Sequence, residues 1–169
     1  QNGSLIKKVY IPKFIFPMSR VFSSFVTMSF SLGAILIVML VTRAPLHWQL
    51  LLFPLPLILL LLFAMGVSMV LSSLSVYFRD VTHLYSVVTL AWMYVTPVFY
   101  PVSALPDEVA WVLKLNPMYY YLDNFRQLVL YGSLPTAKSW CICLLCSGVA
   151  LAVGLAVFRK LQRNFILYL

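Results

Sequence analysis

Long runs without a charged residue dominate the chain. Four stretches of at least 20 residues contain no Asp, Glu, Lys or Arg: 21–42, 44–78, 81–106 and 139–158. A helix rises about 1.5 Å per residue and needs about 20 residues to cross a hydrocarbon core. The second stretch is too short for two spans and the turn between them. We therefore predict an all-α, polytopic membrane protein with four transmembrane helices: about 20–42, 50–76, 84–100 and 138–158.

The connection between the third and fourth spans is patterned as two short helices. The acids after Pro106 mark a helix start, and Asn116 with Pro117 ends that helix. A second helix runs from about Met118 and stops at Gly132, with an apolar stripe along one side: Met118, Leu122, Phe125 and Val129. Each helix is too short to cross a bilayer, so we expect both to lie in or dip into the outer leaflet.

Three consecutive tyrosines, Tyr119, Tyr120 and Tyr121, lie in the second of these short helices. They cover more than half of its circumference, so at least one should face the bundle. Tyrosines at this depth are typical interfacial anchors, and they could equally form a gate over an exit path. The sequence leaves both interpretations open.

The third span carries a stripe of aromatic and hydroxyl side chains. Its members recur at steps of three or four: Tyr85, Thr89, Trp92, Thr96, and Phe99 or Tyr100. Trp92 lies near the middle of the span, where an interfacial aromatic belt does not explain it. The stripe could form part of the bundle core, or it could line a passage for a sugar-containing or amphiphilic molecule.

Composition and charge agree with a membrane protein. Apolar and aromatic residues make up 63% of the chain and charged residues 9%, and the mean hydropathy is +0.97. The formal charge of +8 comes from cations gathered near the two ends. Such cations outside apolar runs are typical of cytoplasmic ends, so we expect both ends in the cytoplasm and no nucleic-acid partner. The spans then occupy 21–158, between segments 1–20 and 159–169.

The sequence lacks the common signatures of catalysis. It has no Gly-Lys-Ser or Gly-Lys-Thr phosphate loop, no H-E-x-x-H pair and no G-x-S-x-G elbow. The spacing of Cys141, Cys143 and Cys146 is no zinc pattern. We therefore expect no catalytic residue, no bound metal and no cofactor on this chain.

The first 20 residues combine cations with apolar side chains and two prolines. This pattern predicts a short interfacial helix, which could anchor the chain to lipid or dock onto another protein. The chain starts at Gln1, which suggests the carboxyl part of a longer protein. Between the second and third spans, Arg79 and Asp80 form a charged turn that could contact a cytoplasmic partner.

Four motifs in one order resemble the permease subunits of type-2 ABC exporters, within them those that export O-antigen, capsule or teichoic acid. The motifs begin with Leu5-Ile6-Lys7-Lys8-Val9-Tyr10-Ile11-Pro12-Lys13 and continue with Tyr77-Phe78-Arg79-Asp80-Val81, Thr96-Pro97-Val98-Phe99-Tyr100-Pro101 and Leu115-Asn116-Pro117-Met118 followed by Phe125-Arg126. The resemblance covers the whole chain. Family members carry two further spans upstream, so by this resemblance the chain looks like the carboxyl two-thirds of a six-span permease.

The resemblance implies roles for particular residues. Those of ATPase coupling would be Ile6, Lys7, Lys8, Val9, Tyr10, Pro12, Arg79 and Asp80. The substrate path would be lined by Tyr85, Thr89, Trp92, Thr96, Phe99 and Tyr100. The paired short helices would be extracellular re-entrant helices, with a gate formed by Pro97, Pro101, Asn116, Pro117, Tyr119, Tyr120 and Tyr121.

The resemblance also implies partners and a mechanism. Two permease subunits would form a path in the bacterial inner or cytoplasmic membrane, among membrane lipids. Two separate ATPase subunits would bind ATP and Mg and drive a lipid-linked glycan outward. Two alternatives remain: an ABC permease that exports a drug or lipid, and a membrane-embedded transferase that acts on a lipid-linked sugar.

Overall fold

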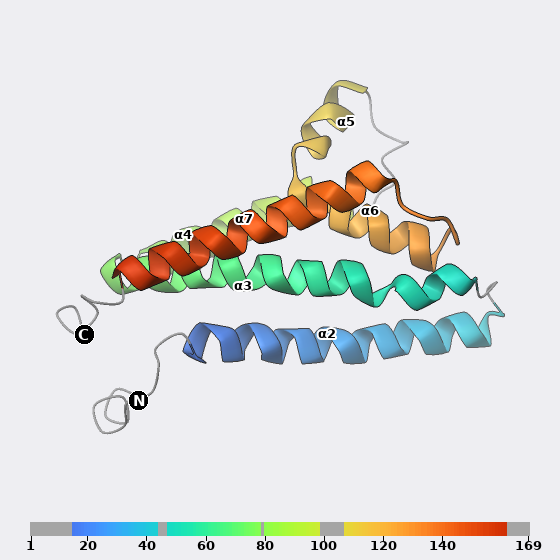
Figure 1. The fold of residues 1–169 in the computed structure, drawn as a ribbon, viewed down its shortest axis with the longest axis horizontal. Helices are drawn as coiled ribbons and strands as arrows, with labels where there is room; N and C mark the ends of the chain where they lie inside the picture. The colour runs from blue at the N-terminus through green and yellow to red at the C-terminus, as the bar shows by residue number, and fades with distance from the viewer. Residues whose placement is uncertain (1–14, 44–46, 79, 99–106, 162–169) are drawn as a thin grey trace.

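The computed structural model describes residues 15–43, 47–78, 80–98 and 107–161. Every regular element in these ranges is a helix, which confirms the all-α prediction for this part of the chain (Figure 1). In chain order the helices are α2 (Ile15–Val41), the 3-10 helix η1 (Trp48–Leu52), α3 (Pro54–Tyr77), α4 (Val81–Val95), α5 (Asp107–Lys114), α6 (Pro117–Val129) and α7 (Ala137–Leu161).

Three segments are long and apolar enough to cross a membrane: Ile15–Val41, Trp48–Val76 and Ala137–Leu161. They correspond to the first, second and fourth predicted spans. α2 begins at Ile15, before the expected boundary, because Pro17 falls in the first turn, where a missing N–H breaks no helical bond. α3 likewise has prolines in its first turn, at Pro54 and Pro56.

The third predicted span, 84–100, is helical only as far as Val95 among the described residues. Thr96 has φ −81° and ψ 124°, which is extended backbone. The physical reason is Pro97, because its ring disfavours the helical region for the residue before it. α4 therefore has 15 residues and a length of about 22 Å, shorter than a hydrocarbon core of about 30 Å.

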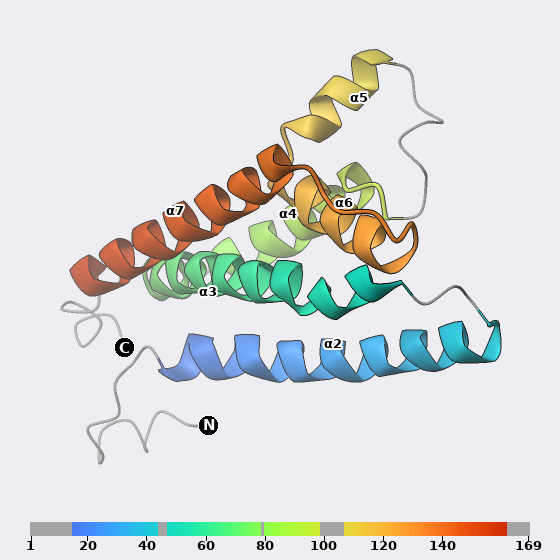
Figure 2. The ribbon, with the colours of Figure 1, turned by 45° about the vertical axis from the view of Figure 1, so that its right-hand side comes forward.

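The arrangement is centred on α3. α2 and α7 lie along opposite sides of α3 in both views (Figures 1 and 2). α3 and α7 make the most extensive contact in the fold. At their crossing Gly66 faces Ala150 and Gly154, and a Cβ added at Gly154 would lie 2.9 Å from the Cα of Gly66. Glycine at this point allows the two backbones to touch.

A small apolar cluster joins one end of the three long helices. Met69 of α3 and Phe158 of α7 are buried there, and Met18 of α2 packs against them together with Val76 and Leu161. The cluster fixes the start of α2 to the last part of α3 and α7. The position of these three helices at that end is therefore set by side-chain packing.

Four hydroxyl side chains of α2 are hydrogen-bonded within the helix itself. The hydroxyls of Ser19, Thr27, Ser29 and Ser31 each donate to a carbonyl three or four residues earlier. All four side chains are exposed on the surface of the chain. A hydroxyl that is bonded in this way can face lipid without leaving an unpaired donor.

Candidate functional site

The junction between α5 and α6 is built on one asparagine. Asn116 is the N-cap of α6, and its side-chain oxygen accepts a hydrogen bond from the backbone N–H of Met118 at 3.0 Å. Pro117 follows as the first helical residue, where its fixed φ suits a helix start. The Asn-Pro pair thus begins α6 by local chemistry and holds the Asn116 side chain in one orientation.

The same asparagine binds the end of α4. Trp92 Nε1 donates to Asn116 Oδ1 at 3.0 Å, and Asn116 Nδ2 donates to Thr96 Oγ1 at 3.0 Å. The Thr96 hydroxyl donates in turn to the Trp92 carbonyl at 2.9 Å. A few residues further along α6, Arg126 Nη2 donates to the carbonyl of Val98 at 2.8 Å. We refer to these five residues as the α4–α6 seam.

A second polar cluster lies on the other side of α6. Ser139 Oγ donates to Asn124 Oδ1 at 2.5 Å, and Asn124 Nδ2 donates to Cys143 Sγ at 3.4 Å. The Tyr121 hydroxyl donates to the Cys143 carbonyl at 2.9 Å and lies 2.7 Å from Ser147 Oγ. All five side chains are buried. We refer to them as the α6–α7 cluster.

The α6–α7 cluster also reaches α3. Ser147 Oγ donates to the carbonyl of Leu59 at 2.7 Å, and the rings of Phe63 and Tyr121 have centroids 5.8 Å apart. Burial raises the pKa of Tyr121 to about 12, so its hydroxyl keeps its proton and remains a donor. α6 is thereby joined to two of the long apolar helices.

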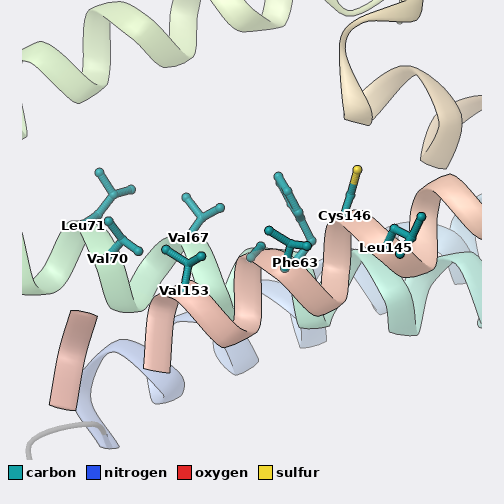
Figure 3. Close-up of a pocket in the computed structure, with 9 residues that line it drawn as sticks. Phe63, Val67, Val70, Leu71, Leu145, Cys146 and Val153 are labelled. Carbon is teal, nitrogen blue, oxygen red and sulfur yellow. The ribbon is translucent and has the colours of Figure 1, made fainter. Parts of the chain in front are cut away.

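An apolar groove with a cavity volume of about 530 Å³ runs along α3 and α7 (Figure 3). Its α3 wall includes Phe63, Val67 and Val70, and its α7 wall includes Cys146 and Val153. Aliphatic and aromatic walls can contact hydrocarbon but supply no acid, base or nucleophile pair. In the described ranges no three His, Cys, Asp or Glu side chains lie where they could hold a metal ion.

The residues assigned to the path lie along one side of α4. Tyr85, Thr89 and Trp92 are exposed, and Thr96 is buried in the seam. The Thr89 hydroxyl donates to the carbonyl of Tyr85 at 2.7 Å. Phe99 and Tyr100 lie outside the described residues. The structure thus brings two path residues, Trp92 and Thr96, into contact with the gate residue Asn116.

The remaining gate residues differ in burial. Pro97 and Tyr121 are buried, whereas Pro117, Tyr119 and Tyr120 are half-buried. Pro101 lies outside the described residues. The prediction that at least one of the three tyrosines faces the bundle is confirmed by Tyr121, whose exposed fraction is 3%.

Tyr119 and Tyr120 form a ring pair at the start of α6. Their centroids are 5.2 Å apart, with the rings edge to face at 79°. Burial and the nearby negative charge of Asp123 raise the pKa of Tyr119. The Tyr119 phenol therefore stays protonated, and both rings are half-buried next to the seam residue Asn116.

The predicted apolar stripe of α6 is not the face that the structure buries. The buried residues of α6 are Tyr121, Asn124, Leu128 and Val129. Of the predicted stripe only Val129 is among them, and the other three side chains are half-buried. The reason is that α7 supplies hydrogen-bond partners for Tyr121 and Asn124, so polar side chains can take the inner face.

The residues assigned to ATPase coupling fall mostly outside the described part of the chain. This applies to Arg79 and to the segment from Ile6 to Pro12, with its residues Lys7, Lys8, Val9 and Tyr10. Asp80 is described, and it lies exposed directly before α4, where its carbonyl accepts from the N–H of Leu84 at 3.0 Å. Its side chain is therefore accessible at the turn between α3 and α4.

Sequence reasoning missed four residues that the structure joins to this site: Arg126 of the seam, and Asn124, Ser139 and Ser147 of the α6–α7 cluster. The sequence does contain a signal for the α6–α7 cluster, in the spacing of its polar residues. Ser139, Cys143 and Ser147 recur at steps of four in α7, and Tyr121 and Asn124 are three apart in α6. Matching the two polar faces would have paired these helices.

Comparison with known proteins identifies a family. The profile described as ABC-2 type transporter matches residues 4–130. The chain is similar to the O-antigen export system permease protein RfbA of Klebsiella pneumoniae, with 27% identity over 97% of this chain and 63% of that protein. RfbA of Myxococcus xanthus is 28% identical over 95% of this chain and 63% of that protein.

A third relative is the capsule polysaccharide export inner-membrane protein CtrC of Neisseria meningitidis, which is 27% identical over 63% of this chain and 40% of its own length. The chain spans 63% of the length of each RfbA relative. The family profile covers well over half of the chain, and it includes α2 to α6 with the whole α4–α6 seam. The chain belongs to the ABC-2 type transporter family.

Proposed function

We propose that this chain acts in a permease that exports a lipid-linked polysaccharide of the O-antigen, capsule or teichoic acid type across the plasma membrane. The observation that carries the proposal is that relatives named for two kinds of polysaccharide export align along the chain. The exposed aromatic and hydroxyl side chains of α4 suit such cargo, because sugars stack on flat rings and bond to hydroxyls.

The energy for export comes from a separate ATPase in this proposal. ATP and Mg bind to that subunit, since this sequence has no phosphate loop. A second permease subunit completes the path. Ile6, Val9 and the Arg79–Asp80 turn contact the ATPase, and both ends of the chain lie in the cytoplasm.

We further propose that α4 is a membrane span, the third of four along the chain. A helix of about 22 Å needs help to cross, and the extended residues that follow it supply additional length. Non-helical backbone at membrane depth is tolerated where protein covers it. Thr96 and Pro97 are buried, and the Val98 carbonyl accepts from Arg126, which supports this placement. α5 and α6 are then the re-entrant helices on the outer side.

The topology can be tested with single cysteines at the two ends of α4. Asp80→Cys and Val98→Cys would be made where Cys141, Cys143 and Cys146 are replaced by alanine, because both positions are exposed. If α4 crosses the membrane, an impermeant thiol reagent applied outside intact cells labels Val98→Cys and spares Asp80→Cys. Labelling of both positions from the same side would refute the proposal that α4 spans the membrane.

Export itself is tested by complementing a deletion strain. Trp92→Ala in the protein expressed from its own gene should lower surface polysaccharide and leave the assembled complex intact. Leu90→Ala is the matched control, because Leu90 is exposed on α4 about 200° around the helix from Trp92. Equal surface polysaccharide in both variants would contradict the path assignment.

The ATPase contact has its own test. Replacing Ile6 and Val9 by Asp should abolish co-purification of the ATPase subunit, because a charged side chain cannot enter an apolar docking surface without loss of hydration. Retention of the ATPase would contradict the docking role. If wild-type protein purifies without any ATPase and modifies a lipid-linked sugar without ATP, the transferase alternative is correct instead. Export of a drug or lipid with unchanged surface polysaccharide would favour the alternative that the chain belongs to a drug or lipid exporter.

A further inference from the structure

α6 is held by polar contacts on two sides, and the two sides differ in burial. On the α7 side, Tyr121, Asn124 and Cys143 have exposed fractions of 3%, 0% and 0%. On the α4 side, Trp92 is 41% exposed and the bond from Arg126 to the Val98 carbonyl is exposed. The α6–α7 cluster is therefore closed off from its surroundings, whereas the α4–α6 seam is partly open.

This difference decides which contact can open at lower cost. Separating α6 from α7 would leave both polar ends of the Asn124 amide buried and without partners, which is strongly unfavourable. Separating α6 from α4 would break the buried Asn116–Thr96 bond, but Trp92 and Arg126 already lie partly at the surface, so their polar groups can bond to water or lipid headgroups. The seam can therefore exchange its partners at lower cost than the cluster.

The contact of α7 with α3 adds to the difference between the two sides of α6. The Tyr121 hydroxyl bonds in α7, and Ser147 of α7 bonds to the Leu59 carbonyl of α3. α3 and α7 are themselves in backbone contact at Gly66 and Gly154. A chain of contacts thus runs from α6 through α7 to α3.

We propose that Asn124 and Tyr121 are positioning residues that hold α6, α7 and α3 together as one body, so that the outer end of the path opens at the α4–α6 seam. This inference rests on the proposed transport function, and it adds the place at which the gate moves. α4 moves relative to α6, and the Trp92–Asn116 and Asn116–Thr96 bonds break and re-form.

The test uses cross-links across each contact. Asn124→Cys places a thiol beside the native Cys143, since the two side chains are 3.4 Å apart in hydrogen-bonding contact. Thr96→Cys with Asn116→Cys does the same across the seam, where the side-chain atoms are 3.0 Å apart. Cys141 and Cys146 are replaced by alanine in both cases. The thiols are joined by oxidation or by a methylene-bridged bis-thiosulfonate, and each variant is compared before and after reduction.

The expected results are opposite for the two pairs. The Asn124→Cys variant should lose export when reduced and regain it when cross-linked to Cys143, because the covalent bond replaces the lost amide contacts. Adding Cys143→Ala removes this rescue and is the matched control. The seam pair is compared with its own reduced form, and whatever export that form supports should be lost on cross-linking and return on reduction. Loss of export on cross-linking Asn124→Cys to Cys143 would overturn the proposal.

A second measurement does not depend on those variants or on the exported substance. Hydrogen exchange is followed in the wild-type complex, with ATP and after trapping with vanadate. The indole N–H of Trp92, which donates to Asn116, should change its exchange rate between the states, and amides from Cys143 to Ser147 should not. The reverse pattern would overturn the proposal. If surface polysaccharide does not depend on the wild-type chain, the transport function fails separately, and the exchange data still locate the moving contact.

Discussion

Adding one methyl group at the crossing of α3 and α7 should destabilise the fold. In Gly66→Ala the new Cβ would clash with the backbone carbonyl of Ala150, and in Gly154→Ala it would clash with the carbonyl of Gly66. Backbone atoms cannot rotate away as a flexible side chain can. The two helices must therefore move apart, which loosens the contact that holds α3 to α7.

The chain offers two matched controls. A Cβ added at Gly33 of α2 or Gly148 of α7 meets nothing within 4 Å. All four substitutions gain the same intrinsic helix propensity, up to about 1 kcal/mol. The difference between a crossing variant and a control therefore isolates the clash.

The size of the effect follows from the cost of overpacking, which is about 1–3 kcal/mol. For a chain of about this length, each kcal/mol lowers the melting temperature by roughly 2–4 °C. Gly66→Ala and Gly154→Ala should thus melt roughly 2–12 °C below Gly148→Ala. The double variant should lose less than the sum of the two, because helices already separated by the first methyl accommodate the second.

The assay is thermal unfolding of the purified complex in one detergent, followed by fluorescence or by loss of monodisperse protein. Gly33→Ala and Gly148→Ala are measured alongside. If all four variants melt within a degree or so of each other, the two backbones are not in contact at Gly66, and the reasoning is refuted.

Three further predictions concern the site and its surroundings. Tyr121→Phe should lower the free energy of unfolding by about 0.5–1.5 kcal/mol, since one buried hydrogen bond is lost; an unchanged melting temperature would contradict this. The pKa of Tyr121 is raised to about 12, so its contribution to the free energy of unfolding is complete below the ordinary tyrosine value of about 10 and is lost as pH rises through about 12. The difference in melting temperature between wild type and Tyr121→Phe should therefore stay constant between about pH 7 and pH 9. Trp92→Phe, which keeps a ring but lacks the N–H that bonds Asn116, should retain more surface polysaccharide than Trp92→Ala; equal loss would show that the ring contributes nothing. Gly132→Ala should destabilise the fold by at least about 1–2 kcal/mol in the same melting assay, because Gly132 has φ +57° and packs against the ring of His47. Adding His47→Ala should remove the clash with the ring but not the cost of the positive φ, so it should recover only part of the lost stability.

The sequence allowed the helices to be predicted because their causes are local. Uncharged runs predict α2, α3 and α7, and the Asn116-Pro117 pair predicts the end of the first short helix, with the second expected from about Met118. α4 ends at Val95, before the predicted end of the third span at about residue 100, because the length of an uncharged run does not register the effect of Pro97 on the residue before it.

The site could be predicted only in part for a different reason. Trp92 and Thr96 belong to one periodic stripe, but their partner Asn116 lies 24 and 20 residues away. Likewise, Tyr121 and Asn124 take the inner face of α6 because α7 supplies partners 15 to 26 residues further along. Periodicity within one helix describes which residues share a face, and it contains nothing about the bonds that another helix offers to that face.

The hydroxyls of α2 have a mechanical consequence. Ser19, Thr27, Ser29 and Ser31 donate to carbonyls of their own helix, so these bonds travel with α2 when it moves. α2 can turn about its long axis or slide past α3 without breaking these bonds, and the packing of Met18 against Met69 and Phe158 opposes the motion. α3 and α7, by contrast, are in backbone contact at Gly66 and Gly154, so neither helix can slide along the other without moving away from it. The bundle thus contains one helix contact that permits sliding, between α2 and α3, and one that fixes the relative position of two helices, between α3 and α7.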